Sequence, residues 1–212
     1  MSGQGIRAVI FDKDGVLIDT EGEYDRRRRI FFAENGIDDS AFPDFYGSNN
    51  AVIWGCVEPN DPVRREELYQ AFLARFEDEP IQYSCFLVPG VADTLRALKG
   101  RGLLLGLASS SPHWCIDNFL ADCGLTGIFD VVLSGEEVAA PKPAPDVYLA
   151  VMEVLGVEQN QVLVVEDSPI GLRAAHDSGA RVCSILPPSA PDLDQSLADV
   201  HADCFGDVLS LV

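Results

Sequence analysis

The stretch IRAVIFDKDG, residues 6–15, decides the fold of this 212-residue chain. Its first six residues form a short apolar run with the composition of a buried strand, and Asp12 follows at once. A second run of this kind, QVLVVED over residues 161–167, ends at the acidic residues Glu166 and Asp167. Continuously apolar strands are typical of parallel sheets that are covered on both faces. These two runs therefore predict a parallel sheet with polar groups at one edge.

Strands and helices alternate along the rest of the chain from about residue 86 onward. The expected strands cover residues 103–109, 130–133 and 181–186, and the expected helices cover 91–99, 112–123, 144–155 and 170–177. After Asp203 the pattern favours a further strand and a short helix. This alternation predicts an α/β fold with helices on both faces of the sheet. Ligands of such sheets bind beyond the carboxyl ends of the strands, so the chemistry should gather there.

Residues 21–76 differ from the rest of the chain in composition and periodicity, and they predict a small helical unit. They are charged, aromatic and helical in period, and prolines interrupt them. The run Arg26 to Arg29 is expected on a solvated helix face, where Glu23–Arg27 and Asp25–Arg29 form favourable pairs four residues apart. Trp54 is expected in the apolar core of this unit.

Composition and charge limit the possible partners and the compartment. Lys plus Arg number 15 against 34 Asp plus Glu, so the net charge of −19 disfavours nucleic acid and anionic membranes. We find no apolar stretch long enough to cross a bilayer and no secretory signal, and we expect a cytoplasmic protein. The six cysteines contain no Cys-x-x-Cys pair and are expected as free thiols.

Four sets of polar residues follow the predicted strands. Asp12 and Asp14 lie two residues apart before Gly15, so a cation or a shifted pKa must accompany two carboxylates held this close. Glu166 and Asp167 add hard oxygen ligands, which favour magnesium over zinc. Each set also has a plain structural interpretation as a solvated turn or a helix cap.

The other two sets are suited to an anion. Ser109, Ser110 and Ser111 combine small side chains with backbone N–H groups at the start of a helix, which is a natural phosphate cradle or, again, a cap. Lys142 is one of only three lysines in the chain and lies between two prolines that stiffen its backbone. The Lys142 ammonium, fixed in this position, would bind phosphate and offset the repulsion between the acidic sets. The alternative is a solvent-exposed lysine without a partner, which is the more common situation for this residue type.

Taken together, four segments resemble the haloacid dehalogenase superfamily of phosphotransferases. They are FDKDGVLIDTE, LASSS, KPAPDVY and VVEDSPIGLRAA, in the family's order and spacing from residue 6 to about residue 186. Within the superfamily the chain is most similar to the phosphatases and sugar phosphomutases of the β-phosphoglucomutase-like group. The resemblance implies a Rossmann-like catalytic core, residues 1–18 and 86–212, with an inserted helical cap domain over residues 19–85.

The resemblance also implies roles for individual residues. Asp12 would be the nucleophile, and Asp14 the general acid for the leaving oxygen and then the base for water. Lys142 would hold the phosphate and Asp12, while Ser109 and the backbone of Ser110 would bind phosphate oxygens. Mg²⁺ would be bound by Asp12, the Asp14 carbonyl and Asp167, with Glu166 completing or supporting that shell.

The cap residues separate the possible activities. The loop Gly47, Ser48, Asn49 and Asn50 is expected to face substrate and can hydrogen-bond hydroxyl groups without offering positive charge. Sugar phosphomutases of this group use a His, an Arg and a Lys of the cap to grip a second phosphate, and residues 19–85 contain neither His nor Lys. We therefore expect a monomeric phosphatase acting on a small phosphorylated metabolite, such as a sugar phosphate. The alternatives are a β-phosphoglucomutase-like mutase and a non-catalytic phosphometabolite-binding protein.

Overall fold

A six-stranded parallel sheet forms the centre of the larger part of the chain. The computed structural model describes residues 5–48, 50–186 and 193–212. The strand order is β3-β2-β1-β4-β5-β6, and every neighbouring pair is parallel. The strands are β1 (Ala8–Phe11), β2 (Leu104–Ser109), β3 (Val131–Ser134), β4 (Val162–Glu166), β5 (Arg181–Ile185) and β6 (Val200–Ala202). The predicted α/β fold is confirmed.

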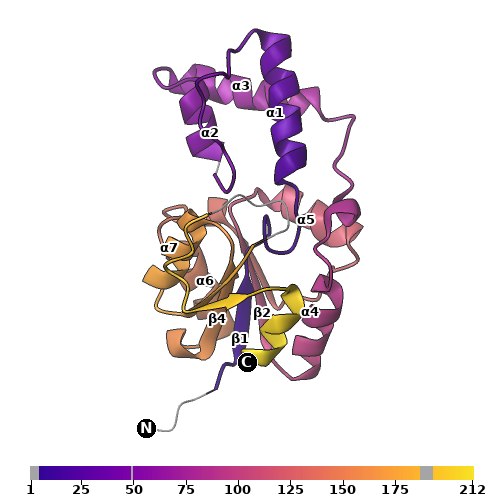
Figure 1. The fold of residues 1–212 in the computed structure, drawn as a ribbon, viewed down its shortest axis with the longest axis vertical. Coiled ribbons are helices and arrows are strands. Elements are labelled where there is room, and N and C mark those ends of the chain that lie inside the picture. Colours follow the sequence, from indigo (N-terminus) through magenta and orange to yellow (C-terminus); the bar gives the residue numbers. More distant parts are fainter. Residues whose placement is uncertain (1–4, 49, 187–192) are drawn as a thin grey trace. The chain divides into compact units, whose positions relative to one another are not determined.

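Helices cover both faces of this sheet (Figure 1). They are α4 (Val91–Gly100), α5 (His113–Asp122), α6 (Asp146–Leu155) and α7 (Pro169–Asp177). Shorter 3-10 turns are η1 (Tyr83–Phe86), η2 (Gly135–Glu137), η3 (Gln159–Gln161) and η4 (Phe205–Ser210). The predicted helices and strands are present with ends shifted by a few residues. One detail of the tail is wrong, because β6 precedes Asp203 rather than following it.

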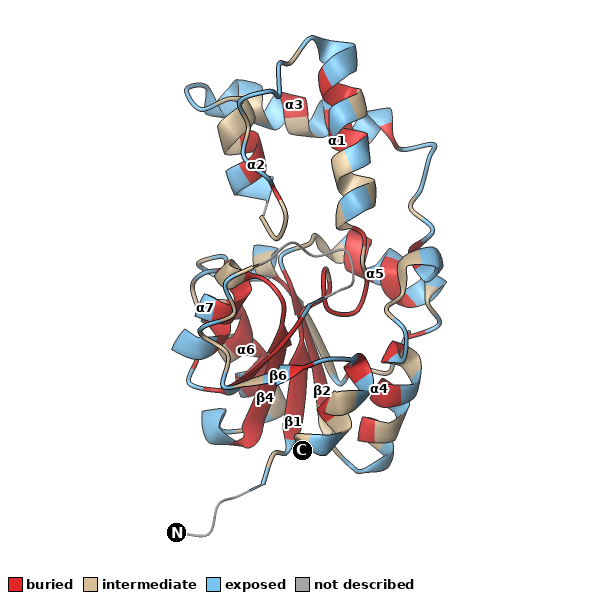
Figure 2. Ribbon diagram, in the orientation of Figure 1, coloured by how far each residue is buried: buried red, intermediate tan, exposed pale blue. Residues whose placement is uncertain are grey.

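The side chains of successive β1 residues point to opposite faces of the sheet, as the two-residue period of a strand requires. Ile10 packs in the cluster that includes Tyr148 of α6 and Leu172 of α7. Phe11 points to the other face, where its ring stacks on Phe205 with centroids 5.5 Å apart. All four residues of β1 are fully buried, and Figure 2 shows the strands as the buried centre of the core. The central strand therefore holds the loop that follows it on a rigid base.

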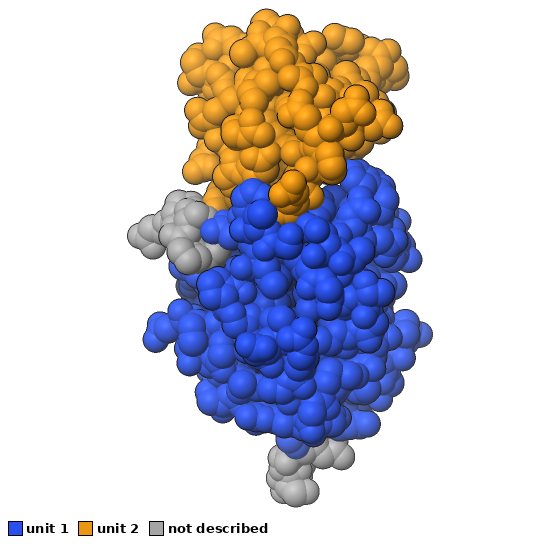
Figure 3. Space-filling model, turned by 90° about the vertical axis from the view of Figure 1, so that its right-hand side faces the viewer, with its two compact units in different colours: residues 1–19, 83–212 blue, residues 20–82 orange. Residues whose placement is uncertain are grey.

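The chain divides into two compact units, residues 1–19 with 83–212, and residues 20–82 (Figure 3). The smaller unit contains α1 (Glu21–Asn35), α2 (Asn50–Val57) and α3 (Pro62–Arg75). Its core is largely aromatic: Trp54 is 3% exposed and lies against Phe31, Phe32 and Phe72. The expected place of Trp54 in this core is confirmed.

The expectation that Arg26 to Arg29 form a solvated helix face is wrong for the middle two residues. Arg27 and Arg28 are 8% and 7% exposed. The Arg27 guanidinium donates to the carbonyl of Glu79 and lies over the ring of Phe76. The expected ion pairs Glu23–Arg27 and Asp25–Arg29 are present. Long arginine stems can cover apolar surface while their charged heads find acceptors, which periodicity alone does not reveal.

Two further expectations bear on the whole chain. All six cysteines are free thiols, as predicted. Among the described residues, no helix combines the length and the apolar character that crossing a membrane requires.

Candidate active site

The loop after β1 carries the two aspartates in a tight reversal. The Asp12 N–H donates to the carbonyl of Val165, which ties the start of the loop to β4. The Lys13 carbonyl then accepts from the N–H groups of Leu17 and Ile18, which folds the chain back within a single turn. The loop therefore presents Asp12 and Asp14 at the carboxyl edge of the sheet.

Gly15 lets the end of β4 approach this loop. Its φ of +82° lies in the left-handed region that favours glycine. A Cβ atom on Gly15 would lie 2.0 Å from Oδ2 of Asp167, so any side chain there would displace that carboxylate. Asp167 is 2% exposed. Its carboxylate thus packs directly against the backbone that follows Asp14.

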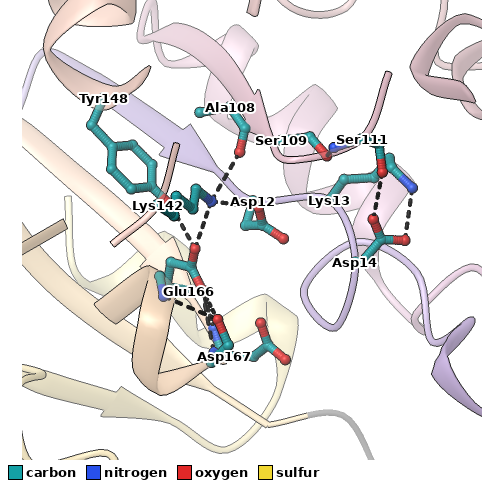
Figure 4. Close-up of polar contacts among 12 residues, drawn as sticks. Asp12, Lys13, Asp14, Ala108, Ser109, Ser111, Lys142, Tyr148, Glu166 and Asp167 are labelled. Carbon is teal, nitrogen blue, oxygen red and sulfur yellow. Dashed lines mark hydrogen bonds and ion pairs between the residues drawn. The ribbon is translucent and has the colours of Figure 1, made fainter. Parts of the chain in front are cut away.

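Lys142 reaches the site from the loop between β3 and α6 and joins two acidic residues (Figure 4). Its Nζ atom lies 2.6 Å from Oδ1 of Asp12, 2.7 Å from Oε1 of Glu166 and 3.3 Å from the carbonyl of Ala108. The side chain is buried, and Nζ lies 4.7 Å from the ring centroid of Tyr148. The predicted convergence of this lysine with Asp12 is present, across 130 positions of sequence.

Glu166 is anchored through both of its carboxylate oxygens. Oε1 accepts from Lys142 and from the Tyr148 hydroxyl at 2.7 Å, and Oε2 accepts from the N–H groups of Asp167 and Ser168. Gly171 leaves room for it, since a Cβ atom at that position would lie 1.8 Å from Oε1. These bonds direct Glu166 towards the lysine.

One ammonium between two buried carboxylates distributes their protonation unequally. Burial raises the pKa of Asp12 to about 7, against the opposing effect of Lys142. Burial also acts to raise the pKa of Glu166, but Lys142 and the hydrogen bonds from Tyr148 and the Ser168 backbone outweigh it, so this pKa is lowered. More protein hydrogen-bond donors therefore stabilise the negative charge of Glu166 than that of Asp12. Asp12 is left as the carboxylate that would gain most from an additional cation.

Asp14 has a separate set of partners. Lys13 Nζ lies 2.7 Å from its Oδ1, and the Ser111 hydroxyl donates to its Oδ2 at 2.9 Å. Lys13 is fully buried. Burial acts to lower the pKa of this lysine, but the neighbouring Asp14 carboxylate outweighs burial and raises it. The Asp14 pair is therefore a second ion pair, in which the lysine is buried and the carboxylate is partly exposed.

The serines after β2 contribute in different ways. Ser109 is 1% exposed, and its hydroxyl accepts from the N–H of Ser111. Ser110 is exposed. Because Ser109 is the last residue of β2, next to β1 in the sheet, this loop lies at the same edge as Asp12. The phosphate-binding roles of Ser109 and Ser110 stay predictions.

The predicted substrate-facing loop lies in the unit of residues 20–82. The Gly47 N–H donates to Glu21, and the Asn50 side-chain amide donates to the Tyr69 hydroxyl at 3.1 Å. Ser48 is half-buried, and Asn49 lies outside the described residues. A role of these residues in binding substrate stays a prediction.

The donor groups of the core fit a hard divalent cation. Asp12 and Glu166 share Lys142, Asp14 pairs with Lys13, and Asp167 packs against Gly15, so within the described residues of this network four carboxylates are balanced by two lysines. Among the described residues no cluster of three or more His, Cys, Asp or Glu side chains forms a metal cage. Mg²⁺ does not need one, because it commonly binds one or two carboxylates and completes its shell with water and substrate oxygens.

Three residues with contacts to this network were missed by sequence reasoning. The signal for Lys13 is its position between two aspartates. Ser111 lies in the run of three serines, and Tyr148 lies in the segment KPAPDVY, but neither pattern indicates a partner. Their contacts depend on side-chain directions that a motif does not specify.

Comparison with known proteins assigns the chain to a family. The model of the haloacid dehalogenase-like hydrolase family matches residues 9–185. The chain belongs to this family. Hydrolases of the family generally use Mg²⁺, and the chain is a phosphatase, as its relatives indicate.

Several members of this family are similar over most of their length. Hexitol phosphatase B of Escherichia coli (strain K12) is 34% identical over 204 residues, covering 93% of this chain and 90% of the relative. The phosphorylated carbohydrates phosphatase of Thermotoga maritima is 33% identical, covering 82% of each chain. The crystal structure of CbbY from Rhodobacter sphaeroides in complex with phosphate has a TM-score of 0.78 at 26% identity, covering 96% of each chain. The resemblance noted in the sequence is therefore confirmed.

Proposed function

We propose that this phosphatase depends on Mg²⁺ and hydrolyses a small sugar phosphate through a phosphorylated Asp12. The observation that carries the proposal is the 2.6 Å contact between Lys142 Nζ and Asp12 Oδ1. A buried cation at this position favours the approach of an anionic phosphoryl group to an anionic nucleophile. Phosphoryl transfer chiefly requires such positioning and charge neutralisation.

The proposed reaction has two steps. In the first, an Asp12 oxygen attacks phosphorus, the bond to the leaving oxygen breaks, and Asp14 gives that oxygen a proton. In the second, Asp14 takes a proton from water, the water oxygen attacks phosphorus, and phosphate leaves with Asp12 restored as a carboxylate. Lys142, Ser109 and the Ser110 backbone would hold the phosphoryl oxygens. Two easier steps thus replace one difficult step.

A bound Mg²⁺ would neutralise part of the phosphoryl charge. We assign its protein ligands to Asp12, Asp167 and the carbonyl of Asp14. Glu166 is assigned a supporting role, because both of its oxygens already accept hydrogen bonds from Lys142, Tyr148 and two backbone amides. Through those contacts it would orient the lysine rather than bind the ion itself.

The relatives and the net charge support the proposed class of substrate. Two relatives are named as phosphatases of hexitols and of phosphorylated carbohydrates, which supports a sugar phosphate. We assign the unit of residues 20–82 to the cap, where Gly47, Ser48, Asn49 and Asn50 would bind sugar hydroxyls. A net charge of −19 supports a small substrate over a nucleic acid. We expect the enzyme to act as a monomer in the cytoplasm.

A screen of phosphorylated metabolites with and without Mg²⁺ tests this proposal. The expected result is release of inorganic phosphate from one or a few sugar phosphates, only when Mg²⁺ is present, with Asp12→Asn inactive on all of them. Tight binding of sugar phosphates without turnover would instead establish a phosphometabolite-binding protein.

The mutase alternative needs its own measurement. A hexose 1-phosphate supplied with its bisphosphate would be converted to the 6-phosphate without net loss of phosphate if the chain were a mutase. Phosphate release at a rate above that of isomer formation supports the phosphatase. The absence of any lysine from residues 20–82 favours this outcome, since a second phosphate then lacks a lysine to hold it.

A further inference from the structure

The complete burial of Lys13 is unexpected for a charged residue in this loop. The side chain is fully buried although it lies at the polar edge of the sheet. Its Nζ atom lies 5.6 Å and 5.9 Å from the ring centroids of Tyr83 and Phe119. Removing an ammonium group from water is costly unless a counter-charge accompanies it. An apolar residue would fill this place without that cost, so the charge calls for a reason.

The ion pair of Lys13 points to that reason. Its ammonium contacts Oδ1 of Asp14 at 2.7 Å, and the Ser111 hydroxyl donates to Oδ2 of the same carboxylate at 2.9 Å. The two donors come from different loops, one after β1 and one after β2. Figure 4 shows both bonds meeting at the Asp14 carboxylate, apart from the contacts of Lys142 with Asp12. Each oxygen of Asp14 is thus held by its own donor.

A carboxylate held through both oxygens has a restricted rotamer. Asp14 is the residue to which we assign proton transfer in both chemical steps, and such a group must point at the oxygen with which it exchanges a proton. A carboxylate that is free to rotate would reach this geometry only part of the time. Errors of about 1 Å in such positioning can cost about 10²-fold in rate.

We infer that Lys13 is a positioning residue for Asp14: its buried ammonium, with the Ser111 hydroxyl, holds this carboxylate in the orientation that proton transfer requires. The inference rests on the proposed function, because it assumes that Asp14 is the acid and base of the reaction. In this inference Lys13 acts on the reaction through Asp14, its ion-pair partner.

The variant Lys13→Met tests the inference, because methionine has a similar length and fills the aromatic pocket without the charge. Two substrates are compared: the best sugar phosphate, whose alkoxide leaving group needs a proton, and p-nitrophenyl phosphate, whose nitrophenolate does not. With the sugar phosphate, kcat should fall about 10²-fold at an unchanged KM. With p-nitrophenyl phosphate, a burst of nitrophenolate should form at nearly the wild-type rate, followed by slow turnover limited by water attack.

Phe119→Leu is the matched control, since it disturbs the same pocket and leaves the ammonium and Asp14 in place. It should lower the melting temperature without separating the two substrates. Ser111→Ala removes the other donor and should reproduce the Lys13→Met pattern with a loss of about 10-fold. It keeps the inference testable if Lys13→Met does not fold.

A double-mutant cycle completes the test, because a residue that acts through Asp14 has no further effect once Asp14 is replaced. Lys13→Met added to Asp14→Asn should therefore leave the remaining activity unchanged. A nitrophenolate burst slowed as much as turnover of the sugar phosphate, full activity of Lys13→Met, or additive losses in the cycle would overturn the inference while the phosphatase assignment stands. A wild-type protein without turnover would overturn the proposed function, and this inference with it.

Discussion

The two halves of the site pair an aspartate with a buried lysine in opposite ways. Asp12 receives Lys142 from a loop 130 positions away, and that lysine is shared with Glu166 and the carbonyl of Ala108. Asp14 is paired with its own neighbour in sequence, Lys13, and with one hydroxyl. The first pair is part of a dense polar network that only the packed sheet assembles. The second pair joins sequence neighbours, and the rings of Tyr83 and Phe119 lie beside its lysine.

This difference predicts unequal consequences of mutation. Within the dense network, removal of one partner leaves another buried charge without its counter-charge. Within the local pair, removal of the lysine chiefly frees a carboxylate that is one-quarter exposed and can be hydrated. Stability should therefore depend more on the Asp12 side, while the Asp14 side should affect mainly the rate of proton transfer.

The largest expected effect is on activity, from Asp12→Asn. The amide cannot act as the nucleophile, so kcat should fall more than about 10⁴-fold. Phosphate release from the best substrate measures this loss. The melting temperature should not fall, because burial already disfavours the charged form of Asp12 and raises its pKa. Retained turnover in this variant would remove Asp12 from the role of nucleophile.

Lys142→Met should have the largest effect on stability. Glu166 is 1% exposed and would lose the ammonium that offsets its burial, which is expected to cost about 3 kcal/mol in the free energy of unfolding. Urea denaturation measures this cost. The double variant Lys142→Met with Glu166→Gln should recover part of the stability, because the buried charge is removed together with its partner. A double variant no more stable than Lys142→Met would contradict the shared network.

Tyr148→Phe tests the outer part of the same network. The ring and its contact with Lys142 remain, but Glu166 loses the hydroxyl that donates to it at 2.7 Å. Hydrogen bonds to charged groups contribute about 1.5–3 kcal/mol, so the free energy of unfolding should fall by about 1.5 kcal/mol. Chemical denaturation at neutral pH measures the change. Tyr83→Phe is the matched control in the other half, and there the Glu166 contacts stay intact.

Metal binding should depend on pH on the Asp12 side. Burial raises the pKa of Asp12 to about 7, and a cation binds the carboxylate only in its ionised form. The apparent affinity for Mg²⁺ should therefore be constant well above pH 7 and fall by about 10-fold per pH unit below it. Calorimetric titration with Mg²⁺ alone at pH 8, 7 and 6 measures this slope. In Asp12→Asn the contribution of this group should disappear.

The smallest expected effect comes from an ion pair outside the site, which serves as a reference for both halves. Glu23 accepts from Arg26 and Arg27 on α1, and the hydrogen bond from Arg26 is the main cause that lowers its pKa to about 2. A lowered carboxyl pKa stabilises the fold above the unfolded value of about 4.5, and the contribution is lost as pH falls towards 2. Glu23→Gln should thus cost about 0.5–1 kcal/mol at pH 7 and less at pH 3. Urea denaturation of both proteins at the two pH values checks the sign.

The sequence by itself determined the order of strands and helices and the edge at which the chemistry lies. Apolar runs that end at Asp12, Ser109 and Glu166 indicate both the strands and the polar edge of the sheet. Strand formation and burial can be predicted in this way because they depend on residue types over short windows. The motifs also identified the family, which the comparisons confirm over residues 9–185. Local pattern was sufficient for these conclusions because each depends on neighbours along the chain.

Only the tertiary structure decided which charge meets which. That Lys142 joins Asp12 to Glu166, that Lys13 is buried beside Tyr83 and Phe119, and that Arg27 and Arg28 are buried all depend on packing between distant segments. The physical reason is that the cost of burying a charge depends on the partners and the solvent around it in three dimensions. A sequence records the type of each charged residue, whereas the fold sets its distance to every other charge.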